Sequence, residues 1–141
     1  MKLLYEAPDF SVVHDQPNQW LYLSWQGEHS PATTRHRCDQ VLSYVRQTGS
    51  ALILNDSSQD LDSWGEVTGW VAHDFMSELA ESGVLTIAWV LPENLRARTD
   101  SEAVVLMRRL ANLTRPVLST FADLESAHTW LLRQTRPAPP R

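Results

Sequence analysis

Three short apolar runs constrain the fold of this chain most strongly. They cover residues 51–54, 84–91 and 117–121, and each is followed by a polar loop and then a segment with helical spacing. Strands buried on both faces of a parallel sheet have this pattern, because helices cover them on either side. The alternation predicts an α/β protein. It also predicts that a binding site lies where these strands end at their carboxyl side, around residues 55–58 and 92–94.

The amino-terminal part of the chain has a different pattern. Residues 2–6, 9–14 and 19–25 have strand character, and residues 15–18 (Asp-Gln-Pro-Asn) favour a turn between the last two segments. Two strands joined by so short a connection pair in the antiparallel sense. The fold class that we expect is therefore α/β, with a single-layer mixed β-sheet covered by about four helices. The sheet is antiparallel in its amino-terminal strands and parallel in the strands that follow.

Capping residues indicate where the helices begin and end. Ser30 followed by Pro31 is typical of a helix start, and Gly49 can end that helix in the left-handed conformation. Apolar residues at three- and four-residue spacing within residues 38–45 give this helix one stripe to bury. The other helices are expected to begin near Trp64, Thr99 and Asp123.

Length, charge and cysteine content narrow the class of protein. A chain of 141 residues, 43% of them hydrophobic, favours one domain, placed at 1–134, with a flexible proline-rich tail at 135–141. The net charge of −5 disfavours nucleic acid as a partner, since nucleic acid requires a basic face. No run has the length of a membrane helix or the pattern of a secretion signal, so we expect no membrane insertion. The single cysteine, Cys38, favours a cytoplasmic location.

The chain contains no specific catalytic or metal-binding motif. A nucleophilic Ser57 or Ser58 would need a base, for which His73 is the nearest candidate, and no Gly-x-Ser-x-Gly pattern is present. The histidines and the cysteine lack the paired spacing of a zinc site. We therefore expect no enzyme, no metal and no cofactor. An enzyme centred on the loop that begins at Asp56 is the third and last hypothesis.

Several segments together resemble the STAS domains, in particular their SpoIIAA-like branch. The similar segments are 20–27, 54–56, 64–79, 83–90 and 121–131. In well-known members, a serine or threonine at the start of the helix after the corresponding strand is phosphorylated by a kinase that is also the binding partner. The resemblance implies Ser57, Ser58 and Ser63 as the candidates by position. Together with Asp56 they define a candidate phosphorylation and partner-binding loop; the alternative is that these residues cap and form turns.

Two further groups of residues are candidate sites. Trp70 and His73 lie away from the apolar stripe of their helix and predict a partner surface, because tryptophan is enriched at binding hot spots. The alternative is burial of Trp70 under a neighbouring element. Arg96 and Arg98 follow a predicted strand and are candidate contacts for an anion, the alternative being a solvated helix face.

Two functions of different classes follow. The first is a non-catalytic STAS-like regulatory domain in the cytoplasm, similar to an anti-sigma-factor antagonist, which binds a protein partner and forms a homodimer. The second, implied by the SEC14-like folds together with which the SpoIIAA-like branch is described, is a small carrier that binds an apolar or lipid-like ligand between the helices and the sheet. The carrier requires a cavity at that interface, whereas the regulatory domain requires an exposed partner surface.

Overall fold

The computed structural model describes residues 1–61, 68–92 and 115–134. Within these residues six strands form one sheet: β1 (Lys2–Ala7), β2 (Phe10–Asp15), β3 (Trp20–Gly27), β4 (Leu52–Asp60), β5 (Thr86–Val90) and β6 (Val117–Phe121). Helix α1 (Pro31–Thr48) connects β3 to β4. A second helical segment precedes β5 and comprises α2 (Thr68–Trp70), the π-helical turn η2 (Val71–Phe75) and α3 (Met76–Glu81). Helix α6 (Leu124–Gln134) follows β6.

The strands lie in the sheet in the order in which they occur along the chain. The pairs β1–β2 and β2–β3 are antiparallel, and β3 to β6 are parallel, which confirms the expected α/β protein with one mixed sheet. Crevices for ligands in open α/β sheets form where the strand order reverses. The order does not reverse among the six described strands, so the topology gives no support to a site at their carboxyl ends.

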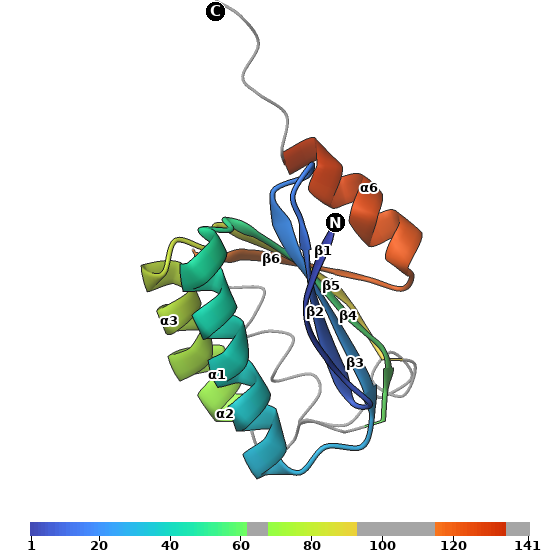
Figure 1. The fold of residues 1–141 in the computed structure, drawn as a ribbon, viewed down its shortest axis with the longest axis vertical. Coiled ribbons are helices and arrows are strands. Elements are labelled where there is room, and N and C mark those ends of the chain that lie inside the picture. Colours follow the sequence, from blue (N-terminus) through green and yellow to red (C-terminus); the bar gives the residue numbers. More distant parts are fainter. Residues whose placement is uncertain (62–67, 93–114, 135–141) are drawn as a thin grey trace, which may run out of the picture.

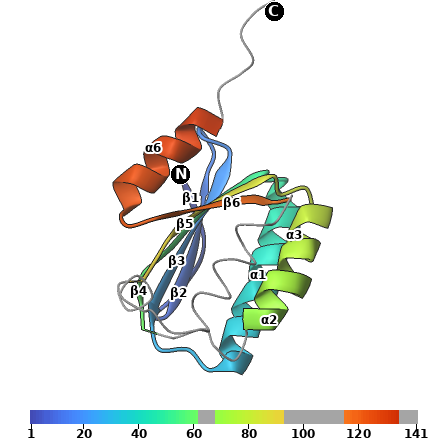
Figure 2. The same ribbon diagram turned by 180° about the vertical axis from the view of Figure 1, so that it is seen from behind.

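Helices cover both faces of the sheet. α1 and the segment from α2 to α3 lie on one face, and α6 lies on the other (Figure 1, Figure 2). Because successive side chains of a strand point to opposite faces, each face has its own core. Ile53 of β4 belongs to the larger core, together with residues of α1, η2 and α3, whereas Leu52 and Leu54 belong to the smaller core with residues of α6.

Three predicted helix ends are confirmed. Ser30 Oγ accepts a hydrogen bond from the N–H three residues later (3.1 Å), and Gly49 has φ 68°, in the left-handed region. Asp123 Oδ1 accepts in the same way from the third N–H after it (2.7 Å). These bonds satisfy backbone groups that a helix end leaves unpaired. The described residues contain three helical segments: α1, the segment from α2 to α3, and α6. The fourth expected helix, beginning at Thr99, lies outside the described residues, and so does the helix start expected near Trp64.

Strand β4 is longer than the sequence predicts. The apolar run indicates an end at Leu54, but the strand continues through Asn55, Asp56 and Ser57 to Asp60. Asn55 pairs with both neighbouring strands, so these polar residues lie inside the sheet and not in a loop. The polar extension is stable there because aromatic side chains of the flanking strands supply hydrogen-bond donors to it, as described below.

The helical segment before β5 contains one widened turn. The N–H of Met76 donates to the carbonyl of Val71, five residues earlier, which is the π-helical pattern. Val71, Ala72 and Phe75 of this turn are buried against the larger core. Turns of this kind are rare and occur frequently at functional sites. No feature of the sequence pattern predicts it.

Candidate ligand-binding cavity

A cavity lies inside the larger core, between the sheet and its helices. The space in it that the centre of a water-sized molecule can occupy is about 40 Å³, and all the empty space of the hollow, open solvent at its mouth included, is about 550 Å³. Side chains of β3, β4, β5, α1, η2 and α3 line it, and nearly all of them are apolar. Among the lining residues are Leu23, Val41, Ile53, Val71, Met76 and Leu79.

Asn55 brings a polar group to this apolar wall. Its Oδ1 accepts a hydrogen bond of 2.7 Å from the indole Nε1–H of Trp25, on the neighbouring strand β3. An indole N–H can only donate, so the amide oxygen of Asn55 has to face Trp25. The amide nitrogen is then held in the other position. In the part of the chain that the structure describes, this nitrogen makes no hydrogen bond.

A second tryptophan makes the equivalent contact two residues further along β4. Trp89 Nε1–H on β5 donates to Ser57 Oγ at 3.1 Å, and Ser57 is 0% exposed. The two indoles therefore flank β4 on the cavity side and satisfy its polar residues from either neighbour. A kinase requires an accessible hydroxyl, and the Ser57 hydroxyl has no exposed surface in this fold.

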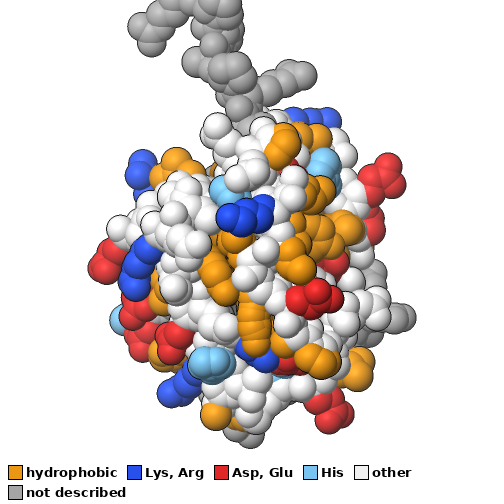
Figure 3. Space-filling model, viewed as in Figure 1, with side chains coloured by type: hydrophobic (Ala, Val, Ile, Leu, Met, Phe, Trp, Pro, Cys, Tyr) orange, Lys and Arg blue, Asp and Glu red, His pale blue; other side chains and the backbone are white. Residues whose placement is uncertain are grey.

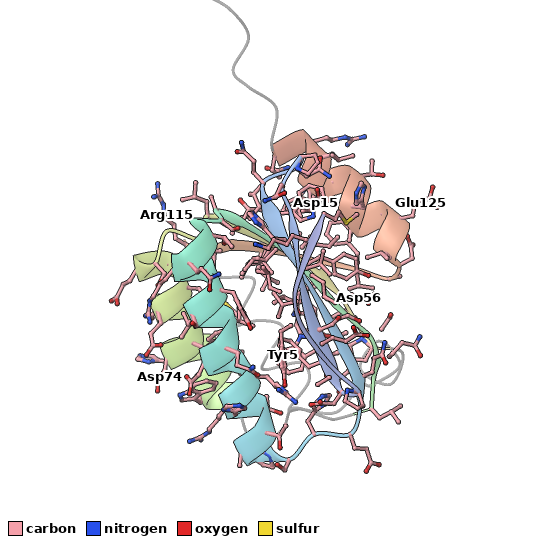
Figure 4. All side chains as sticks on the ribbon, viewed as in Figure 1. Tyr5, Asp15, Asp56, Asp74, Arg115 and Glu125 are labelled. Atoms are coloured by element: carbon pink, nitrogen blue, oxygen red, sulfur yellow. The ribbon has the colours of Figure 1, made fainter. Side chains whose placement is uncertain are left out.

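Asp56 and Ser58 belong to the same strand but lie outside this cavity. Asp56 Oδ2 accepts from the Tyr22 hydroxyl (3.3 Å) and its Oδ1 from the N–H of Ser58 (3.0 Å). Figure 4 shows Asp56 on the side of the sheet where α6 lies. Burial and the Asp56 charge raise the pKa of Tyr22 to about 12. The structure thus separates Asp56 from Ser57 on opposite faces, and Ser63 lies outside the described residues.

Trp70 is half-buried and packs against the larger core, as in the alternative of burial against a neighbouring element. Its ring stacks on Phe75 with centroids 5.8 Å apart and planes 11° apart, and the Arg35 guanidinium of α1 lies 5.4 Å from its centroid. Phe75 also lines the cavity, so Trp70 covers the outside of the cavity wall. His73 is exposed and contacts its neighbour Asp74 (Nδ1 to Oδ1, 2.8 Å). The candidate anion contacts Arg96 and Arg98 lie outside the described residues.

Cys38 is part of the cavity wall and is fully buried. Burial, with a smaller contribution from the nearby Asp39 charge, raises the pKa of its thiol. The thiol is therefore neutral at physiological pH and acts as a small apolar side chain.

A polar cluster that the sequence analysis did not predict holds α1 against the sheet. Arg37 of α1 makes two hydrogen bonds to the Asp9 carboxylate (2.7 and 3.1 Å) and one to the Tyr5 hydroxyl (2.8 Å). Buried His29 lies between Asp9 and Asp60, with Nδ1 3.4 Å from the Asp60 carboxylate. Burial alone would raise the pKa of Asp9, but the hydrogen bonds and charge of Arg37 lower it. Sequence separations of 28 and 32 residues leave no local signal for these contacts.

Strand β1 forms one edge of the sheet. In Figure 3 hydrophobic side chains gather in the middle of the view, where β1 lies in Figure 1, and Leu3 of β1 is 54% exposed. The pairing of β1 with β2 shifts register between Leu3 and Tyr5. Such irregularities make an edge strand a poorer template for pairing with a second chain. The expected homodimer therefore stays a prediction.

No group of three His, Cys, Asp or Glu side chains within residues 1–61, 68–92 and 115–134 is arranged to hold a metal ion. None of the helices in these same ranges has the length and apolar character needed to cross a bilayer. The chain matches no protein-family model, and no curated protein is significantly similar to it in sequence.

Proposed function

We propose that this protein is a non-catalytic binding domain that holds a small apolar ligand between its sheet and the helices α1 and η2–α3. The observation that carries the proposal is the cavity itself, because the interior of a protein is normally packed without voids larger than a water molecule. A hollow lined by apolar side chains, with a polar group at one point, is the usual form of a small-molecule site.

The size of the cavity limits the ligand. Pockets for drug-sized ligands measure roughly 300–1,000 Å³, whereas the cavity volume here is about 40 Å³. A long acyl chain would displace several core side chains, so we expect a compact molecule of a few heavy atoms. The parts of the wall suited to small adjustments are Met76, with its flexible unbranched side chain, and the widened turn η2.

Binding can be tested with a hydrocarbon probe. Methylenecyclopentane has six carbon atoms and no polar atom, and its binding can be followed by methyl NMR. We expect saturable shifts at the methyl groups of Val41 and Leu79, which line the cavity, and none at Leu131 of α6, which is buried in the smaller core on the other face of the sheet. Absence of saturable binding of both this hydrocarbon and the ketone of the same shape, cyclopentanone, or shifts confined to the α6 side, would overturn the proposal.

A partner-binding regulatory role of the STAS-like type, predicted from the sequence, is the second candidate function. The contact between Phe75 and Trp70 favours it, because a residue of the cavity wall stacks directly on a half-exposed indole. A protein partner that binds over Trp70 and His73 would then sense a change in the wall. In a pull-down from a lysate of the cells that produce this protein, the partner should be lost in Trp70→Ala. It should be retained in Leu132→Ala, which truncates a surface residue on a different helix, α6. Equal capture by both variants would count against this role.

A further inference from the structure

We infer that the ligand of this cavity carries a hydrogen-bond acceptor, such as a ketone or aldehyde oxygen, and that the Asn55 amide nitrogen recognises it. This inference rests on the proposed function, because it concerns the same cavity. It goes further in assigning the chemical class of the ligand and the residue that selects it.

The orientation of the Asn55 amide carries the argument. The Trp25 Nε1–H at 2.7 Å fixes which end of the amide is oxygen, since the reverse orientation would place two donors against each other. Asn55 lines the cavity, and its nitrogen has two N–H groups without a partner among the described residues. The wall therefore presents donors to the ligand at this point.

Among the residues that the structure describes, the other polar groups that line the cavity are already used. The Trp25 indole is bound to Asn55, the Trp89 indole to Ser57, and the Cys38 thiol is neutral and only a weak donor. Asn55 is thus the residue that can discriminate between ligands of the same shape. A purely hydrocarbon ligand would leave its donors unpaired, whereas a carbonyl oxygen would satisfy them.

A matched pair of ligands separates shape from hydrogen bonding. Cyclopentanone and methylenecyclopentane have the same ring and differ in whether oxygen or a CH₂ group forms the double bond to it. The measurement is the ratio of their dissociation constants, by methyl NMR titration, for the wild-type protein and three variants. Asn55→Asp keeps the acceptor for Trp25 and removes the donors, and Asn55→Leu removes both. Ser57→Ala is the control, because it breaks the neighbouring indole contact and leaves the Asn55 amide intact.

We expect cyclopentanone to lose about 5- to 150-fold in affinity relative to methylenecyclopentane in Asn55→Asp, because its oxygen would be buried without a donor. The loss should be smaller in Asn55→Leu, because that substitution frees the Trp25 Nε1–H, which also lines the cavity, to donate to the ketone. The ratio in Ser57→Ala should stay within about twofold of wild type, because the Asn55 donors are retained. If both ligands bind and Asn55→Asp leaves the ratio unchanged, the inference fails and the proposed function stands. If neither ligand binds the wild-type protein, both fail. Binding of the ketone that disappears in Asn55→Asp would support both.

Discussion

Adding one methylene group at Val71 tests whether the cavity is a true packing defect. Val71 lines the cavity and is 6% exposed, so the extra carbon of Val71→Ile has that space beside it to occupy. Both residues are β-branched, so helix propensity and side-chain entropy change little. Val45→Ile on α1 is the matched control, because Val45 is 0% exposed and does not line the cavity.

The two substitutions should change stability in opposite directions. At about 24 cal/mol per Å³, a void of about 40 Å³ costs the folded state about 1 kcal/mol. A buried methylene contributes about 0.8 kcal/mol, so Val71→Ile should raise the free energy of unfolding by roughly 0.5–1 kcal/mol. At Val45 the same atom enters a packed region, where overpacking costs about 1–3 kcal/mol.

Urea denaturation measures this difference directly. The midpoint should shift upward for Val71→Ile and downward for Val45→Ile, with the slope m unchanged in both, since neither alters the surface exposed on unfolding. Val71→Ile should also weaken methylenecyclopentane binding, whereas Val45→Ile should not. If both variants lose stability by similar amounts, the wall at Val71 is fully packed and the reasoning from cavity volume is wrong.

Three further predictions concern groups whose pKa the structure shifts. Because Arg37 lowers the pKa of Asp9 in the folded state, this pair stabilises the fold above the unfolded value of 3.8 and loses that contribution as the pH falls below it. Urea midpoints measured from pH 7 to pH 3 should therefore fall less steeply in Arg37→Ala than in the wild type, and parallel curves would contradict the assignment. The Tyr22 phenol, with its pKa raised to about 12, should ionise well above the ordinary tyrosine value of 10. Asp56→Asn should move that step toward 10, as read by phenolate absorbance, and an unshifted step would rule out the Asp56 contribution. Cys38 should resist thiol reagents in the native protein at pH 8 and react after unfolding in urea, as followed by mass spectrometry; rapid native labelling would show that the thiol is not sealed in the core.

The sequence by itself determined the arrangement of elements along the chain. Turn residues between two strand segments, Ser30 and Pro31 before α1, Gly49 after it and Asp123 before α6 act on backbone groups within a few residues of themselves. The mixed sheet followed from the same patterns, because buried parallel strands and a hairpin differ in local composition. Local signals of this kind were sufficient to predict these features correctly.

The nature of the candidate site depends on contacts between residues far apart in the sequence. The polar residues after Leu54 were predicted to form a loop, but Trp25 and Trp89, 30 and 32 residues away from their partners, keep Asn55 and Ser57 inside β4. The direction of the Asn55 amide, the widened turn at 71–75 and the void beneath it depend on how separate elements pack together. Such contacts have no local sequence signal, because each polar group is satisfied by a side chain that only folding brings near. The sequence therefore predicted a sheet with its helices, and the packing between them created the cavity.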